Sequence, residues 1–321
     1  MTGNVNFKYT LPSGQSVFSE PNAVTSREGD SALILVKSGN GWCVEHFNID
    51  DNALLLMGNA LNARPDIDLV YLNNMTCSSL ASIDVIGRDG KSLVYREMIN
   101  QQAAVWLTNE KSELFPLKMV LDADGYHPLR SQPQHGELYR RFIPSLQQTL
   151  TISGLDLDVH LPLFHRWQNS DRVSAFWEQT GSMDEHATYL QTQLNNAKNQ
   201  LLILSLDDEP FAYIEAYWAK EDRIAAYYES GQFDRGIHML VGEEHHRGKH
   251  KVAAWLPSVC HFLYLDDPRT QKIVSEPRSD NDKMIRYLQQ HGFAKIKEFQ
   301  FPHKRAALMS QLRETFFESV L

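Results

Sequence analysis

Long apolar runs are missing from this chain of 321 residues. Its apolar stretches are short, such as ALLLM at residues 53–57, whereas a membrane-spanning helix needs about 18 or more consecutive apolar residues. Residues 1–15, MTGNVNFKYTLPSGQ, contain no basic region followed by an apolar segment, so no secretory signal peptide is expected. We therefore expect a cytoplasmic protein that does not enter a membrane.

Cysteine and net positive charge are also scarce. The three cysteines, Cys43, Cys77 and Cys260, are far apart and form no Cys-x-x-Cys pair. This spacing indicates reduced thiols and argues against a disulfide framework or a thiolate zinc site. Acidic residues outnumber basic ones by 40 to 31, and the formal net charge of −9 argues against a general nucleic-acid binder. A site for an anionic ligand must therefore be a local basic patch.

Apolar residues make up 42% of the chain, which is enough for a sizeable core. Residues 121–137 are rich in Pro, Gly, Gln and His and predict a linker. We therefore expect a smaller α/β domain of unassigned role at residues 1–135 and a second domain at residues 136–321. In the second domain, the patterns predict strands at 201–206, 211–218, 236–241, 273–274 and 295–301, and helices at 159–170, 184–198, 249–265 and 280–290. This order is typical of a mixed α/β layer architecture.

Residues 236–250, GIHMLVGEEHHRGKH, hold four of the chain's 13 histidines. Alternation at 236–241 predicts a strand with His238 on one face, and after Gly242 the chain turns into the next helix. A helix start offers unpaired N–H groups and the positive end of the helix dipole, both of which favour an anion. The residues expected to line this anion site are His246, Arg247, Gly248, Lys249, His250 and Lys251. The turn therefore predicts a phosphate or pyrophosphate site.

Other interpretations of these residues stay open. His245, His246 and His250 carry imidazoles for a metal, but basic neighbours repel a cation and no third ligand type is evident, so we expect no metal. The turn can also be a solvated helix start. His238 is either a packed strand residue or a catalytic group. Glu276 ends the expected strand at 273–274, where it either pairs with a histidine on the adjacent strand or belongs to a simple turn.

The turn 245–250, with Asn281 and then Gly292-Phe293 further on, resembles the Q/R-x-x-G-x-G/A loop and following helix of the GNAT acyl-CoA-dependent N-acyltransferases. Longer phrases are more specific: FWEQTGS (176–182), YWAKEDRI (217–224), FDRGIHMLVGE (233–243), DDPRTQ (266–271), EPRSDN (276–281) and KEFQFPHKR (297–305). These phrases resemble the siderophore-biosynthesis branch of that family, and most of all its aerobactin-type hydroxylysine acetyltransferases.

The resemblance implies a GNAT-type mixed sheet flanked by helices in residues 136–321, with acetyl-CoA as co-substrate. It implies that Leu240, Val241 and Gly242 bind the thioester and pantetheine, that the turn 246–251 binds the pyrophosphate, and that Asn281 contacts the pantetheine. It further implies His238 as the base, oriented by Glu276, with Asp280 as the second choice. The tyrosine that many GNAT enzymes use to protonate the thiolate would fall at Leu288, and Tyr287 lies on a different helix face, so the resemblance assigns no residue of this chain to that role.

The implied reaction is transfer of acetyl to the hydroxylamine nitrogen of N6-hydroxylysine, which gives a hydroxamate for iron chelation. A hydroxylamine is largely neutral near pH 7, so His238 need only accept a proton from the tetrahedral intermediate. The candidates for binding the amino-acid head and alkyl chain are Trp177, Glu215, Tyr217, Trp218, Asp222, Arg223, Asp234 and Arg235. The expected partners are the small hydroxylamine, acyl-CoA and other siderophore-pathway enzymes, without nucleic acid or membrane.

Three rival functions remain at this level. The first is transfer of a succinyl or other acyl group to a hydroxylated diamine. The second is a non-catalytic acyl-CoA-binding module, suggested by the degenerate glycine loop and the displaced tyrosine. The third is a zinc-dependent hydrolase that uses the histidine cluster.

Overall fold

The computed structural model describes residues 7–10, 14–47, 52–72, 80, 83–87, 90–108, 117–123 and 125–319. The chain forms two compact units, Met1–Leu107 with Arg141–Thr149 and Thr108–Arg140 with Leu150–Leu321. The predicted boundary at residue 135 differs from this grouping, in which residues 108–140 belong to the second unit and Arg141–Thr149 to the first. A linear division of the chain at residue 135 stays a prediction. Cys77 lies outside the described residues, and Cys43 and Cys260 are free thiols. Within the described ranges, every helix is too short or too polar to cross a lipid bilayer.

The first unit contains an eight-stranded sheet in the order β1-β2-β3-β4-β5-β6-β8-β7. Its strands are β1 (Phe7–Thr10), β2 (Ser16–Glu20), β3 (Ala23–Glu28), β4 (Ser31–Ser38), β5 (Gly41–Phe47), β6 (Leu69–Tyr71), β7 (Val85–Ile86) and β8 (Ser92–Tyr95). Its helices are α1 (Ala53–Ala63), α3 (Arg96–Asn100) and α4 (Ala103–Trp106). Alternate residues of β4, Leu33 and Leu35, enter the core, where Leu56 and Met57 of α1 are also buried.

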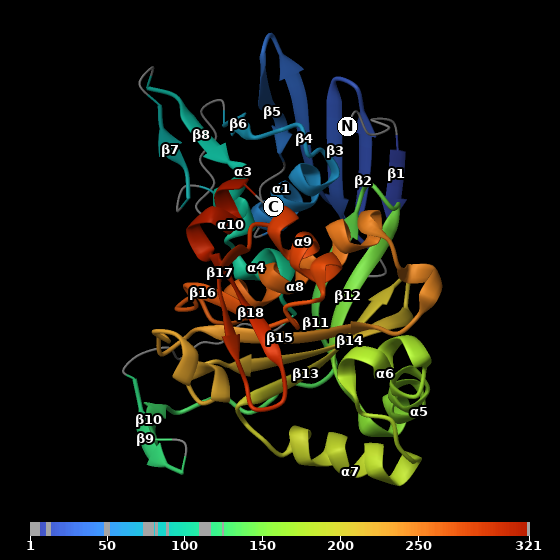
Figure 1. The fold of residues 1–321 in the computed structure, drawn as a ribbon. Helices are drawn as coiled ribbons and strands as arrows, with labels where there is room; N and C mark the ends of the chain where they lie inside the picture. Colours follow the sequence, from blue (N-terminus) through green and yellow to red (C-terminus); the bar gives the residue numbers. More distant parts are fainter. Residues whose placement is uncertain are drawn as a thin grey trace. The chain divides into compact units, whose positions relative to one another are not determined.

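The second unit contains a two-stranded hairpin and an eight-stranded sheet in the order β11-β12-β13-β14-β15-β16-β18-β17 (Figure 1). Its strands are β9 (Met119–Asp122), β10 (Gly125–Pro128), β11 (Glu137–Ile143), β12 (Gln148–Gly154), β13 (Asn199–Leu206), β14 (Glu209–Trp218), β15 (Arg235–Val241), β16 (Lys272–Ser275), β17 (Ala294–Gln300) and β18 (Arg305–Leu312). Its helices are α5 (Leu157–Gln168), α6 (Asp171–Trp177), α7 (Met183–Leu194), α8 (Lys249–Asp266), α9 (Asp282–Gln290) and α10 (Arg313–Ser319), with 3-10 turns η1 (Arg223–Tyr227) and η2 (Glu244–His246).

The mixed α/β architecture expected for the second unit is confirmed. Helices α5, α6 and α7 gather beside β13 and β14 (Figure 1), and α7 contacts β13. Two helix starts are fixed by caps: Asp156 accepts hydrogen bonds from backbone N–H groups of α5, and Ser182 forms a capping box with Glu185 of α7. Helix α7 ends at Leu194, four residues before the end that the sequence pattern predicts.

Strand β15 is paired differently on its two sides. It is antiparallel to β14 along its whole length, from Arg235 opposite Trp218 to Val241 opposite Ala212. Its parallel pairing with β16 covers only Arg235 and Gly236. Past Gly236 the two strands diverge and the backbone ladder between them ends. The carbonyl of Ile237 still accepts a hydrogen bond from the Ser275 hydroxyl at 3.2 Å, and from His238 onward β15 is outside the ladder with β16. This divergence opens a wedge in the sheet.

The two sheets have the same order of connection. In each sheet, one helix connects two parallel neighbouring strands, β5–α1–β6 and β15–α8–β16. The next two strands form a hairpin, β7–β8 and β17–β18, and the second strand of the hairpin pairs with β6 or β16. In the first unit, residues 21–22 join β2 directly to β3, whereas α5, α6 and α7 separate β12 from β13. The segment after β5 has the sequence NIDDN (48–52), acidic where the second unit has its basic turn. The first unit thus repeats the order of strand connections, and its sequence at 48–52 contains no basic residue.

Candidate active site

Two cavities adjoin each other along β15 in the second unit. The larger has a volume of about 620 Å³ and is lined in part by Glu215, His238 and Glu276. The smaller has a volume of about 180 Å³ and is lined in part by Leu240, Val241 and Gly248. Both cavities share the wall residues Phe176, Trp177, Met239, Asn281 and Met284. One ligand can therefore reach from the smaller cavity into the larger.

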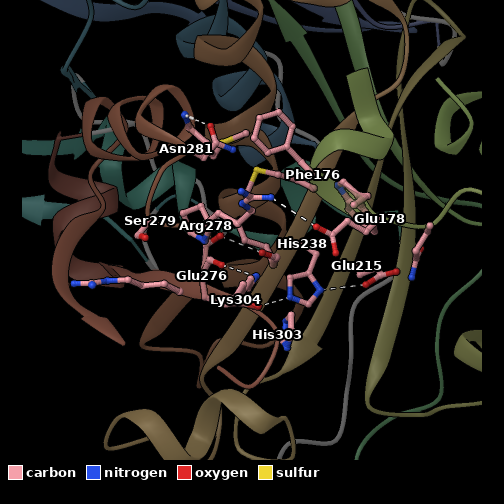
Figure 2. A pocket seen from close by; sticks show the side chains of 18 of the residues that line it. Phe176, Glu178, Glu215, His238, Glu276, Arg278, Ser279, Asn281, His303 and Lys304 are labelled. Carbon is pink, nitrogen blue, oxygen red and sulfur yellow. Dashed lines mark hydrogen bonds and ion pairs between the residues drawn. The ribbon is translucent and has the colours of Figure 1, made fainter. Parts of the chain in front are cut away.

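His238 lies between two carboxylates (Figure 2). Its Nδ1 is 3.2 Å from Glu215 Oε2, and its Nε2 contacts Glu276 Oε1. Strand register places Glu215 of β14 directly opposite His238 of β15, and Glu276 follows the end of β16. Asp280 instead binds the guanidinium of Arg278 at 2.8 Å. The structure therefore brings Glu276, and not Asp280, to His238.

Three tyrosines hold the two carboxylates. Tyr189 and Tyr213 donate hydrogen bonds to Glu215 Oε1 at 2.5 Å and 2.9 Å. Tyr217 donates to Glu276 Oε2 at 2.7 Å. The carboxylate side chains are almost completely buried, so these hydrogen bonds replace the water that the ions lose.

The charges of this group follow from its burial and pairing. Burial opposes the charge of His238, but the charge of Glu276 and the hydrogen bonds to both glutamates outweigh it and raise the pKa of His238 to about 10. Burial also opposes the carboxylate ions, yet His238 lowers the pKa of Glu276 to about 2 and lowers the pKa of Glu215 as well. These opposite shifts favour an imidazolium between two carboxylates at neutral pH, a group with a net charge of −1. A ring that already carries both protons has no free nitrogen to accept another.

Gly242 packs the end of β15 against α5. Its N–H donates to the carbonyl of Phe211 at 2.8 Å, and its carbonyl accepts from Arg172 at 2.8 Å. A Cβ at this position would lie 2.1 Å from the ring of Trp167, so only glycine fits. The backbone groups of Gly242 are therefore engaged within the protein, and Leu240 and Val241 form the cavity wall beside it.

The basic turn begins α8 at the smaller cavity. Gly248 caps the helix with a φ of 119°, in the left-handed region that favours glycine. Arg247 and Gly248 line the cavity, and Lys249, His250 and Lys251 form the first turn of the helix. The turn thus presents helix N–H groups and basic side chains together. His246 does not join them, because its buried ring binds Glu209.

Helix α9 supplies the opposite wall of the smaller cavity. Asn281 lines both cavities, and its Oδ1 accepts from the N–H of Met284 at 3.2 Å, which caps the helix. Leu288 is completely buried, whereas Tyr287 lines the smaller cavity. Tyr287 therefore lines the cavity, although it precedes by one residue the position, Leu288, at which the family's tyrosine was expected.

The candidates for acceptor binding divide into two groups. Trp177, Glu215 and Arg223 line the larger cavity, and Tyr217 lies behind Glu276. The remaining candidates have other contacts: Trp218 stacks between Arg130 and Arg235, Asp222 caps η1, and Asp234 accepts from Tyr228 and Gly231. Since none of this second group is a wall residue, their contact with substrate stays a prediction without structural support.

Several wall residues escaped the sequence analysis. The larger cavity is also lined by Glu178, Tyr189, Arg278, His303 and Lys304. Arg278, His303 and Lys304 lie within the phrases EPRSDN and KEFQFPHKR, which is the only signal that marked them. Tyr189 had no such signal, because only the packing of α7 on the sheet brings it to Glu215.

Comparison with known proteins agrees with this geometry. Residues 156–301 match the family model described as an acetyltransferase (GNAT) domain. The chain is 39% identical over 261 residues to the N(6)-hydroxylysine O-acetyltransferase of Escherichia coli, which covers 80% of this chain and 82% of that protein. It is 50% identical over 181 residues to a putative lysine N-acyltransferase of Schizosaccharomyces pombe, covering 56% of this chain but only about half (54%) of that protein.

Among solved structures, an uncharacterized protein from Bacillus halodurans is 28% identical and superposes with a TM-score of 0.55 over 59% of this chain and 95% of that one. The family model covers every lining residue of the smaller cavity and all those of the larger cavity except His303, Lys304 and Arg305. The diverging strand, the glycine-capped basic turn and the match to most of the E. coli protein agree, and the chain belongs to the GNAT acyltransferase family.

Proposed function

We propose that this protein transfers an acetyl group from acetyl-CoA to the hydroxylamine nitrogen of N6-hydroxylysine, which yields a hydroxamate. The main support is the pair of adjoining cavities, one ending at the basic turn and the other at the Glu215–His238–Glu276 group. The hydroxylysine acceptor is taken from the name of the E. coli relative. The chain's membership of the GNAT family supports acyl-CoA as the donor.

The donor lies in the smaller cavity. Its pyrophosphate binds to Arg247 and to the N–H groups at the start of α8, where an anion is favoured. The pantetheine arm runs between β15 and α9, past Val241 and Asn281. The thioester then reaches the part of β15 from His238 onward, which lies outside the backbone ladder with β16. Backbone N–H groups held there stabilise the oxyanion of the tetrahedral intermediate.

The acceptor lies in the larger cavity with its hydroxylamine toward His238. Arg223, Arg278 and Lys304 provide positive charge for the carboxylate of the amino acid, and Glu178 provides negative charge for its ammonium group. Trp177 lines the shared wall, where the alkyl chain passes.

The Glu215–His238–Glu276 group accepts the proton that the attacking nitrogen releases. A neutral hydroxylamine attacks without prior deprotonation, and the nitrogen of the tetrahedral intermediate is acidic enough for a weak base. The net charge of −1 stabilises the positive charge on this nitrogen. A carboxylate oxygen takes the proton only transiently and passes it to solvent, because His238 lowers the pKa of both glutamates. In this proposal His238 holds the base and is not itself the acceptor. Tyr287, on the donor side, protonates the departing thiolate. No step requires a metal.

The site of acylation is open to a direct test, because a hydroxylamine has two nucleophilic atoms. The printed name of the E. coli relative specifies O-acetyl transfer, whereas our proposal specifies nitrogen. Only the N-acyl product is a hydroxamate, which forms a coloured complex with ferric iron. Purified protein should be incubated with acetyl-CoA and N6-hydroxylysine, and released CoA and ferric hydroxamate should be measured together.

Equal amounts of the two products support N-acetyl transfer. Release of CoA without hydroxamate contradicts the choice of nitrogen. Parallel reactions with malonyl-CoA, succinyl-CoA and N5-hydroxyornithine determine the acyl group and the chain length of the acceptor. A higher kcat/KM with any of these than with the acetyl-CoA and hydroxylysine pair would replace the proposed substrates.

A further inference from the structure

A second group of ligand-type side chains lies outside the two cavities. Glu209, His245 and His246 bring their ligand atoms within 4.8 Å of one another. Nε2 of His245 is 2.8 Å from Glu209 Oε1, and Nε2 of His246 is 3.1 Å from Glu209 Oε2. The proposed acyl transfer uses none of these three side chains for chemistry.

Backbone contacts bring the three residues together. The N–H groups of Gly242 and Glu243 both donate to the carbonyl of Phe211, at 2.8 Å and 3.2 Å. This pairing holds the segment that follows β15 beside the start of β14, whose first residue is Glu209. The turn before Glu209 is tight, since Asp207 and Asp208 both have positive φ values of 47° and 67°. The positions of Glu209 and η2 are therefore fixed by the sheet and not only by their own side chains.

The three side chains differ in exposure in a way that suits an ion-binding site. The His246 side chain is 4% exposed, and its ring centroid is 5.1 Å from that of Phe211. The side chains of His245 and Glu209 are 60% and 54% exposed, so an ion can enter from solvent and keep water ligands. One ligand is thus anchored, and two can adjust.

We propose that Glu209, His245 and His246 bind a divalent transition-metal ion, for which Zn²⁺ is the probe. Two imidazole nitrogens and one carboxylate oxygen, with a position left for water, form a ligand set that zinc uses, and imidazole also suits copper and nickel. Bonds of about 2.0–2.1 Å to a tetrahedral ion place the ligand atoms about 3.3 Å apart. The separations of 2.8 Å and 3.1 Å run to two different oxygens of Glu209, and the three ligand atoms lie within 4.8 Å of one another. Rotation of the exposed His245 and Glu209 side chains is therefore needed to bring the group to that spacing.

The site adjoins the basic turn, because His246 is followed directly by Arg247 and Gly248. If the turn binds pyrophosphate as proposed above, a bound dication adds positive charge beside it and restrains its geometry. The spacing along the chain hid the third ligand, since Glu209 precedes His245 by 36 residues. His250 belongs to the same histidine-rich phrase but is not part of the group, because its ring lies beside Gly248.

Metal binding can be tested on the full chain without acyl-CoA. Zn²⁺ is titrated into the protein in competition with a chromophoric chelator, and the free chelator reports the affinity and stoichiometry. We expect one Zn²⁺ per chain, with the affinity reduced at least about tenfold in Glu209→Gln and in His246→Ala. His250→Ala is the matched control and should bind Zn²⁺ as the wild type does.

Three outcomes would overturn the proposal: no uptake by the wild type, wild-type affinity in Glu209→Gln, or a loss in His250→Ala as large as that in His246→Ala. Glu209→Gln decides the result if His246→Ala fails to fold, because Glu209 is exposed and the substitution keeps its shape. Circular dichroism checks the fold of each variant. Because the titration contains neither acyl-CoA nor acceptor, its result does not depend on whether the acetyl-transfer proposal is correct.

Discussion

His238 Nδ1 lies 3.2 Å from Glu215 Oε2, on the opposite side of the ring from Glu276. The contact follows from strand register, because β14 and β15 place these two residues opposite each other. With a carboxylate at each nitrogen, the imidazole is held as a cation. The pH dependence of the reaction therefore distinguishes two roles for this histidine.

We expect kcat/KM to be nearly constant between about pH 7 and about pH 8.5, because the protonated His238 is the working form. Above pH 10 the ring loses its charge, the two glutamates lose their counter-ion, and the activity should fall. If neutral His238 were instead the base, kcat/KM would rise about tenfold per pH unit over the same range, because the neutral fraction rises that way below the pKa. Rates measured across this pH range, with saturating acceptor for kcat and limiting acceptor for kcat/KM, distinguish these two results.

Removal of the Glu276 charge should lower the pKa of His238 from about 10, because the charge of Glu276 is the largest contribution that raises it. We expect Glu276→Gln to reduce kcat/KM by about 10²-fold or more and the ring titration of His238, followed by NMR, to move to lower pH. Asp280→Asn is the control, since Asp280 pairs with Arg278, and it should cost less than about threefold. A larger loss in the control than in Glu276→Gln would assign the orienting acid to Asp280.

Tyr287 is expected to act on the donor side. Loss of its hydroxyl in Tyr287→Phe should lower kcat by about 10- to 100-fold with little change in the KM for acetyl-CoA, because the ring that lines the cavity is kept. Steady-state kinetics with acetyl-CoA as the varied substrate measures both constants. An unchanged kcat in this variant would show that another group, or water, protonates the thiolate.

Gly242 tests the close approach of β15 to α5. A Cβ there meets the ring of Trp167, which is held by a hydrogen bond from Nε1 to Glu243 at 2.9 Å and cannot easily move. We expect Gly242→Ala to lower the free energy of unfolding by about 1–3 kcal/mol. Gly181→Ala should have a smaller effect of about 1 kcal/mol, because a Cβ there displaces the Glu185 carboxylate, which costs at most its capping contact with Ser182. Thermal unfolding of both variants gives the comparison, and equal effects would contradict this account.

The sequence predicted the elements whose signal is local. An apolar run indicated β13, alternation indicated β14 weakly and β15 more clearly, and the glycine-containing turn marked the start of α8. Strands β11, β12 and β18 were missed. The pairing of β12 with β13 and of β18 with β16 joins segments far apart in the sequence, which no short window contains. Strand β18 also forms a hairpin with β17, but the sequence pattern did not predict this second strand of the hairpin.

The candidate site was predictable in part for the same reason. His238 and Glu276 were proposed together, and the structure brings them together. Neither the second carboxylate contact from Glu215 nor its consequence for the charge of His238 could be read from the sequence, because both depend on the register of β14 against β15. The displaced position of Tyr287 suggested a different helix face, yet the orientation of α9 still brings it to the cavity.

The central claim is acyl transfer to a hydroxylamine, and a CoA-release assay with paired acceptors tests it most directly. Purified wild-type protein and Glu276→Gln are each supplied with acetyl-CoA and either N6-hydroxylysine or lysine. We expect rapid CoA release by the wild type with N6-hydroxylysine, a rate about 10²-fold lower in Glu276→Gln, and little release with lysine, whose ammonium group is not neutral near pH 7. No CoA release above background with N6-hydroxylysine, or equal release with lysine, would contradict the account.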